Sequence, residues 1–225
     1  MSAGDRRRTL VVPLVTALVC SLFVTATHIL LKPVRQSWAD LDRYRHVLSV
    51  SGLLPAGPAS DRELLALVGE LDAREAPTAA GPATVFLVWQ DLDLQRLILP
   101  VSGQGMWAPI NGYLALGPDL RTVAAVTFHE LAETPGIGDR IQDPAWRAGW
   151  RGKLAYDESG ATLLGASDDP RYRIDAIAGA TVTVTATTKL VRDALGPAGF
   201  GPYLADLRRT GPERKGLQRN GENAP

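Results

Sequence analysis

The 225-residue sequence predicts an α+β domain joined to a single N-terminal transmembrane helix. Three observations support this fold class. An uncharged apolar run lies near the N-terminus, four segments typical of strands follow one another between residues 84 and 130, and helical apolar patterns flank those segments. Because the strand segments are close in sequence and joined by turns, we expect a mostly antiparallel sheet flanked by helices.

The apolar run covers residues 9–31. It contains no Asp, Glu, Lys or Arg and has the length of roughly 20 residues that a helix needs to cross a bilayer. Arginines at 6–8 and the segment Val24-Thr25-Ala26 also leave open a signal peptide with its cleavage site. The run is longer than the apolar core of a usual signal peptide and ends at Lys32, so we expect an uncleaved transmembrane helix.

The orientation of this helix follows from the positive charges near its two ends. Lys and Arg occur three times before the run and four times soon after it, so their numbers do not decide. The three arginines are close together on a short tail, residues 1–8. We therefore expect this tail in the cytoplasm and the large domain on the other side of the membrane.

Residues 32–83 are predicted to form a helical connector. Apolar residues recur at three- to four-residue spacing from Trp38 onward, which indicates a helix that continues from the membrane. Ser60 and Glu63 form a capping box at the start of an apolar stripe, and they predict a helix over 60–73. An Ala- and Pro-rich stretch then ends the connector.

Residues 84–210 are predicted to form the main domain. Its expected strands are 84–90, 94–99, 111–117 and 121–130. Gly117-Pro118-Asp119 supplies a hairpin turn between the last two, and 157–160 supply a later turn.

Three helices are expected after the strands. Asp143 before Pro144 starts a short one that carries two tryptophans. Residues 180–195 are rich in β-branched side chains, but Gly-Pro follows them as it follows a helix, so we predict a helix there. A last helix holds Tyr203, Leu204 and Leu207 against the core. Residues 211–225 lack an apolar pattern and are expected to be disordered.

The composition excludes several functional classes. Lys and Arg number 24 and Asp and Glu number 24, so the formal net charge is zero and nucleic acid is not an expected partner. One cysteine cannot form an internal disulfide bond, and three histidines cannot supply a dense zinc site. We therefore expect no metal site.

Two short patterns resemble known sites only in part. His129-Glu130 matches the start of a zinc-protease helix, but Glu133 stands where the second histidine belongs. Gly103-Gln104-Gly105 is half of a dinucleotide fingerprint without its third glycine or a βαβ unit. The sequence therefore predicts neither a zinc protease nor a dinucleotide site.

Two glycine-containing segments, 133–138 and 175–181, suggest a binding site. Glycine permits the backbone to approach a ligand closely. If 180–195 is a helix, Thr181 lies in its first turn, where free N–H groups and the helix dipole favour a phosphate. The same local pattern also fits an ordinary loop and helix start with no ligand.

Seven segments along nearly the whole chain carry a family resemblance. They are LLKP (30–33), SGQGMW (102–107), GYLAL (112–116), ETPGIG (133–138), PAWRAGWRGK (144–153), DAIAGAT (175–181) and GFGPYLADLR (199–208). In this order they resemble the NqrC family of the Na+-translocating NADH:quinone oxidoreductase, whose members have an FMN-binding domain. The chain departs from the family pattern at Ala178 and Val184, where serines are usual.

The resemblance implies a membrane-anchored electron carrier whose FMN is esterified through its phosphate to Thr181. It implies that Asp175 belongs to the motif read by a separate flavin transferase, which uses magnesium, and that Gly179 and Ala180 complete this motif. The further residues that it places around the flavin are Glu133, Thr134, Ile137, Gly138, Met106 and Trp107. Trp107 could equally belong to the core.

The resemblance also implies the setting. The complex would oxidise NADH, reduce ubiquinone and pump Na+, with NqrA, NqrB, NqrD, NqrE and NqrF as partner subunits. It would lie in a bacterial inner membrane with the FMN domain on the periplasmic side. The alternatives are the G subunit of an Rnf-type complex, which shares the GAT and ETPG motifs, an FMN-binding domain of another electron transfer chain, and a membrane-tethered domain without flavin.

Overall fold

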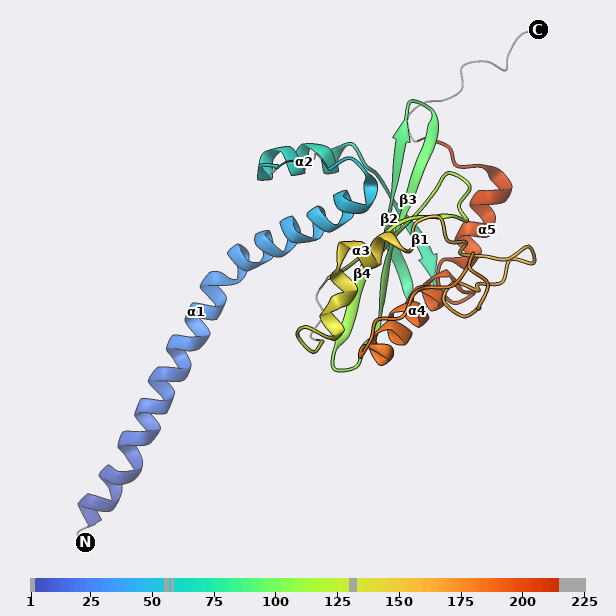
Figure 1. The fold of residues 1–225 in the computed structure, drawn as a ribbon. Helices are drawn as coiled ribbons and strands as arrows, with labels where there is room; N and C mark the ends of the chain where they lie inside the picture. The colour runs from blue at the N-terminus through green and yellow to red at the C-terminus, as the bar shows by residue number, and fades with distance from the viewer. Residues whose placement is uncertain (1–2, 55–56, 58, 130–132, 215–225) are drawn as a thin grey trace. The chain divides into compact units, whose positions relative to one another are not determined.

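The computed structural model describes residues 3–54, 57, 59–129 and 133–214 (Figure 1). The chain divides into two compact units, Met1–Arg43 and Tyr44–Pro225. The first unit is helical, and the second contains the sheet and the remaining helices.

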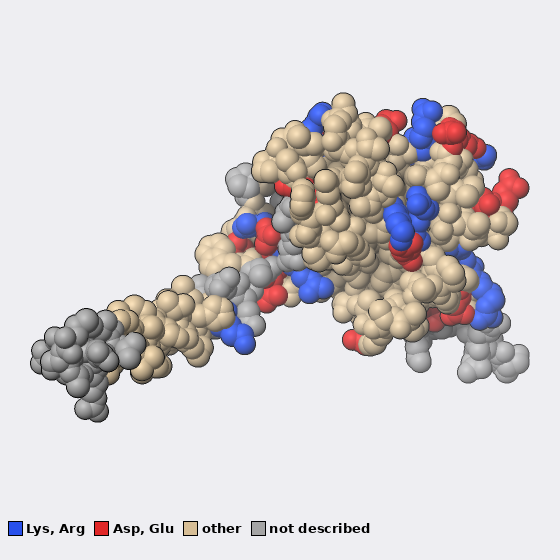
Figure 2. Space-filling model, turned by 90° about the horizontal axis from the view of Figure 1, so that it is seen from below, with Lys and Arg blue, Asp and Glu red and all other residues tan. Residues whose placement is uncertain are grey.

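Helix α1 (Ala3–Ser51) contains the predicted apolar run. Of the residues described, one helical stretch is long and apolar enough to cross a membrane, Val11–Lys32, with a mean hydropathy of 2.2. Its large aliphatic side chains are exposed, and Figure 2 shows the stretch as a mostly tan surface, because residues 11–31 contain no Asp, Glu, Lys or Arg. The helix predicted over 9–31 is therefore confirmed, and it is continuous with the helix predicted from Trp38 onward.

Within the described ranges, five strands form one antiparallel sheet in the order β1-β2-β3-β4-β5. They are β1 (Asp72–Thr78), β2 (Gly81–Gln90), β3 (Asp93–Gln104), β4 (Pro109–Leu116) and β5 (Val123–His129). Each strand pairs with the next one in sequence, so the sheet is a meander. The four predicted strands are confirmed; Glu130, the last residue of the fourth, lies outside the described residues.

The prediction for the connector is wrong at its end. Helix α2 (Asp61–Gly69) begins at the expected capping box, in which Ser60 Oγ accepts from the Glu63 amide, but it does not reach residue 73. The chain instead enters β1, which the sequence does not predict. Strand β1 is an edge strand, and Pro77 fits there because an edge has a side on which no ladder hydrogen bond is needed.

The helices predicted after the sheet are confirmed. Their bounds are α3 (Pro144–Ala148), α4 (Thr181–Leu195) and α5 (Gly201–Thr210), with a 3-10 turn, η1 (Gly138–Gln142), before them. The Asp143 carboxylate accepts from the Ala145 amide and caps α3. Most of the tail predicted to be disordered, residues 215–225, lies outside the described residues.

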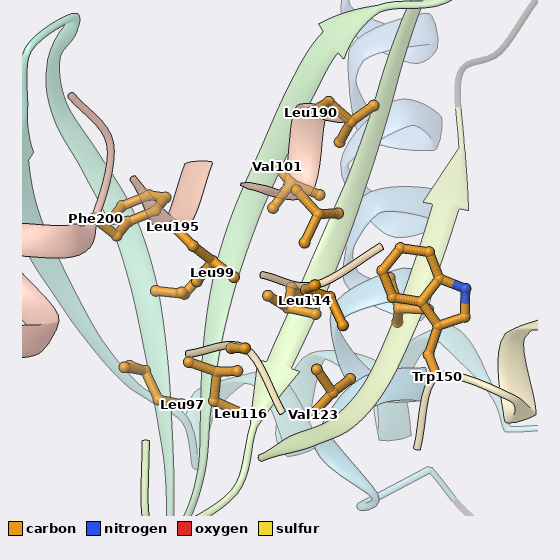
Figure 3. Packing of buried hydrophobic residues seen from close by; sticks show 14 of the residues in the cluster. Leu97, Leu99, Val101, Leu114, Leu116, Val123, Trp150, Leu190, Leu195 and Phe200 are labelled. Atoms are coloured by element: carbon orange, nitrogen blue, oxygen red, sulfur yellow. The ribbon is translucent and has the colours of Figure 1, made fainter. Parts of the chain in front are cut away.

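The sheet buries both of its faces. Alternate residues of a strand point to opposite sides, so Leu97 and Leu99 face one way and Ile98 the other. We call the first side the α4 face: strand side chains such as Leu99 and Leu114 pack there with Leu195 and Phe200 (Figure 3). This packing fixes α4 against the sheet.

The opposite side is called the α2 face. Val47 and Leu48 from the end of α1 and Leu64 from α2 pack there against Phe86 and Ile98. The α2 face also holds a polar stack. Its members are His46, which stacks on His129 at 4.7 Å, Tyr113, which stacks on His129 at 5.5 Å, and Thr127, whose hydroxyl lies 3.2 Å from His46 Nδ1.

Candidate functional site

Thr181 is the first residue of α4, and its side chain is exposed. Ala180 precedes it at the cap position, and no side chain among the described residues caps this end of the helix. The helical ladder starts with the Val184 amide, which donates to the Ala180 carbonyl at 2.9 Å. The first-turn N–H groups therefore have no intrahelical partner, as the sequence predicts for an anion site.

The loop before Thr181 turns sharply at Gly179. This glycine has a φ of +82°, a conformation that side-chain-bearing residues rarely adopt. A Cβ at Gly179 would lie 3.7 Å from Ile137 Cγ2, so the 133–138 turn rests against the loop. Ile177 is buried beneath and anchors the loop in the core on the α4 face.

Trp146 holds the start of the same loop. Its indole Nε1 donates to the Asp175 carbonyl at 2.8 Å, and its ring packs edge-on against Trp150 at 5.6 Å. The Asp175 side chain is exposed. It borders an open hollow of ≈ 470 Å³ whose lining includes Asp168 and Arg173.

Glu133 connects three segments of the site. Its side chain is buried, with 7% exposure. Oε1 accepts from the Met106 amide at 2.9 Å, and Oε2 accepts from the Thr183 hydroxyl at 2.7 Å. The loop after β3, the turn after β5 and the first turn of α4 therefore meet at one carboxylate.

Two glycines make room for this carboxylate. A Cβ at Gly105 would lie 2.5 Å from Glu133 Oε1, and a Cβ at Gly138 would lie 3.0 Å from both Glu133 Oε2 and Thr183 Oγ1. Thr134 closes the turn, because its carbonyl accepts from the Gly138 amide at 2.9 Å. Any side chain at either glycine would displace these contacts.

Four large apolar side chains beside these segments remain exposed. They are Met106 (50%), Trp107 (67%), Ile137 (44%) and Val182 (57%), and we call them the exposed apolar group. Exposed apolar side chains on segments that meet are more typical of a binding site than singly scattered ones. Trp107, which the sequence leaves between flavin contact and core, is not part of the core.

The structure brings most of the predicted residues together and adds two. Met106, Glu133 and Gly138 meet at the buried carboxylate, Ile137 lies against Gly179, and Thr134 shapes the turn between them. Thr183 and Gly105 are the additions. The motif SGQGMW pointed to Gly105, whereas Thr183 lies in a run of similar residues that carried no signal.

Comparisons with known proteins agree on one family. Residues 105–196 match the model of the FMN-binding domain. The chain is 33% identical over 250 residues to the C subunit of the Na+-translocating NADH-quinone reductase of Pseudomonas aeruginosa, an alignment that covers 90% of this chain and 96% of that protein. It is 32% identical to the protein of the same name from Pasteurella multocida, covering 89% of this chain and 94% of that protein.

Solved structures show the same fold. The crystal structure of Shewanella oneidensis NqrC superposes with a TM-score of 0.66 at 24% identity, covering 75% of this chain and 97% of that chain. The C subunit of the Na+-translocating NADH-quinone reductase from Parabacteroides distasonis superposes with a TM-score of 0.65 at 22% identity, covering 77% and 96%.

Proposed function

This chain belongs to the NqrC family of Na+-translocating NADH-quinone reductases, and we propose that it carries FMN on Thr181 and passes electrons within such a complex. It is a membrane-anchored subunit with an FMN-binding domain. The relatives are named as C subunits of the quinone reductase, so we favour that complex over the G subunit of an Rnf-type complex.

One observation carries the assignment of Thr181. An exposed hydroxyl stands at the first position of a helix that lacks a side-chain cap, directly beside the exposed apolar group. The free first-turn N–H groups and the positive end of the helix dipole would hold the FMN phosphate. Ala180 and the sharp turn at Gly179 leave this end of the helix open.

The exposed apolar group would hold the apolar part of the flavin. Met106, Trp107, Ile137 and Val182 offer apolar surface that water otherwise covers, and burying it against a ring system is favourable. Thr134 and Gly138 shape the turn that presents Ile137. When bound, FMN supplies a redox centre that takes up and releases electrons, while the chain binds and orients it.

Covalent attachment requires a second protein. We propose that a flavin transferase, acting with magnesium, reads the segment from Asp175 to Thr181, of which Asp175 is exposed and fixed through its carbonyl. The Thr181 hydroxyl oxygen forms the bond to phosphorus, the phosphoanhydride bond of an activated flavin donor breaks, and the hydroxyl proton passes to a base of the transferase. The nucleotide of the donor is the leaving group.

The proposed setting follows from the same family. The partners are the remaining subunits of the complex, NqrA, NqrB, NqrD, NqrE and NqrF, which together with this chain oxidise NADH, reduce ubiquinone and move Na+. The clustered arginines at 6–8 support a cytoplasmic tail and an FMN domain on the periplasmic side of the inner membrane.

The test is the change Thr181→Ala in a chain co-expressed with a flavin transferase. We expect the unaltered chain to give a flavin-fluorescent band after denaturing electrophoresis and an intact mass raised by one FMN residue, and the variant to give neither. Thr185→Ala is the matched control, because Thr185 is exposed one turn later in α4 and should leave the band unchanged. A Thr181→Ala chain that keeps the fluorescent band contradicts the assignment.

A further inference from the structure

We propose that Glu133 and Thr183 form a positioning pair that holds the exposed apolar group and Thr181 in one fixed arrangement. The inference rests on the proposed function, because it concerns how this chain prepares the site for its flavin. Neither residue needs to contact the flavin in order to act in this way. This role of Glu133 is separate from the flavin contact that the family resemblance implies.

The pair joins parts of the chain that are far apart in sequence. Thr183 lies 50 residues after Glu133, and Met106 lies 27 residues before it. The hydrogen bond from Thr183 fixes the first turn of α4, two residues after Thr181. The hydrogen bond from the Met106 amide fixes the loop that carries Trp107. The Glu133 side chain thus connects the helix start that carries Thr181 with the loop that carries Trp107.

Both oxygens of the carboxylate are used inside the protein. Glu133 is 7% exposed and Thr183 is 3% exposed, so the contact is shielded from water. None of the ion pairs between described residues includes Glu133. A buried carboxylate that lacks a cationic partner is costly, and neutral donors offset only part of that cost. Stability alone therefore gives little reason for a glutamate at this position.

The glycines around the pair support the same interpretation. Gly105 and Gly138 each approach the Glu133 carboxylate so closely that a Cβ would collide with it or with Thr183. The sequence suggested that glycine in the 133–138 turn allows a ligand to approach. The structure shows that at Gly138 the close neighbours are Glu133 and Thr183. The backbone at Gly105 and Gly138 is therefore packed directly against the Glu133–Thr183 pair.

The loss of one hydrogen bond would loosen this arrangement. Without the Thr183 hydroxyl, Glu133 Oε2 would be left buried and unpaired, which is more costly than the loss of an ordinary hydrogen bond. The carboxylate would then turn toward water and release the Met106 amide. The loop that bears Trp107 and the start of α4 would no longer be held at a fixed distance.

The experiment compares Thr183→Val, Thr183→Ser and Thr187→Val in the full chain with a flavin transferase. Thr187 is the matched control, because it is equally buried in the same helix but its hydroxyl donates to the Thr183 carbonyl within the helix. The measurements are the rate of covalent flavin attachment, the visible circular dichroism of the attached flavin, and the thermal midpoint. Circular dichroism reports how the flavin is surrounded and is insensitive to a small loss of stability.

We expect Thr183→Val to lower the attachment rate by roughly tenfold and to change the flavin dichroism. Thr183→Ser, which keeps the hydroxyl, should restore both, and Thr187→Val should alter only the thermal midpoint. The proposal is overturned if Thr183→Val behaves like Thr187→Val, or if serine at 183 fails as valine does. An unaltered chain that takes up no flavin would instead contradict the proposed function, so the two failures are distinguishable.

Discussion

The two faces of the sheet are buried with different chemistry. On the α4 face, aliphatic and aromatic side chains from the strands pack with Trp150, Leu195 and Phe200. On the α2 face, the apolar cluster is smaller and the stack of His46, His129 and Tyr113 lies beside it. Both faces are buried, and among the described residues the candidate site lies at the border of the α4 face.

The difference shows where positional accuracy comes from in this domain. On the α4 face, close packing of many side chains sets the position of the body of α4, and the hydrogen bond from Thr183 to Glu133 holds its first turn, which contains Thr181. On the α2 face, the end of α1 is positioned on β5 by polar contacts. His46 stacks on His129, and its ring nitrogen lies within hydrogen-bond distance of the Thr127 hydroxyl. We therefore expect changes on the α4 face to reach the flavin site, and changes on the α2 face to affect mainly stability.

The largest expected effect comes from two neighbours in β3. Leu99 points to the α4 face, Ile98 points to the α2 face, and both are fully buried. Truncation of either to alanine should lower the free energy of unfolding by about 2–5 kcal/mol, because each leaves a cavity. Urea titration measures this loss.

The same two variants should differ in flavin attachment. Well below both unfolding midpoints, Leu99→Ala should attach flavin more slowly than Ile98→Ala, since Leu99 supports α4. Equal attachment rates in the two variants would show that the faces do not differ in their influence on the site.

An intermediate effect is expected from Tyr156, a polar residue buried on the α4 face. Burial raises its pKa to about 12, and the Arg208 guanidinium, 4.2 Å from its ring centre, opposes the shift. Since the unfolded chain loses this proton near pH 10 and the folded chain near pH 12, stability should fall as the pH rises through that window. A shift of about two pKa units corresponds to roughly 2–3 kcal/mol.

The measurement is the free energy of unfolding as a function of pH for the unaltered chain and for Tyr156→Phe. The phenylalanine variant should be less stable at neutral pH, because the hydroxyl that donates to the Leu195 carbonyl is gone. It should also lose less stability between pH 10 and 12. Parallel pH curves for the two chains would exclude a raised phenol pKa.

The smallest expected effect on stability comes from Trp146→Phe. This change removes the donor to the Asp175 carbonyl and should cost about 0.5–1.5 kcal/mol. Trp150→Phe is the matched change, because the Trp150 indole nitrogen is buried and has no hydrogen-bond partner among the described residues. Trp150→Phe should cost more stability, since Trp150 is fully buried.

The rate of flavin attachment should be affected more by Trp146→Phe than by Trp150→Phe, which is the opposite of their order in stability. We expect Trp146→Phe to attach flavin several-fold more slowly and Trp150→Phe to stay close to the unaltered chain. Single-turnover assays with the transferase measure the rates. If the less stable variant, Trp150→Phe, also attached flavin more slowly than Trp146→Phe, the hydrogen bond to the Asp175 carbonyl would not be what positions the loop.

The sequence predicted most of the fold because its periodic patterns are strong. The four strands between 84 and 130 are rich in β-branched and aliphatic residues, and Ser60 and Glu63 mark the start of α2 correctly. Strand β1 could not be predicted from DAREAPT, which has few β-branched residues and contains a proline. It is a strand because β2 offers it a partner, and a local pattern does not contain that information.

The candidate site was predictable only where a motif marked it. Thr181 was predicted at the first turn of a helix, and the structure places it there. The hydrogen bond from Thr183 to Glu133 crosses 50 residues, so nothing in the sequence near either residue reveals it. The exposure of Trp107 also depends on how its loop is held, and composition cannot distinguish an exposed tryptophan from a buried one.

The meander topology has a consequence for the order of folding. Each strand pairs with its neighbour in sequence, so the sheet needs only short-range contacts and can form while the rest of the chain is still being synthesised. Contact between Thr183 and Glu133 needs a long loop to close, and α4 leaves the ribosome after every strand. Thr181 therefore gains its final neighbours late, and under the proposed function a flavin attached to it would mark a chain whose folding is complete.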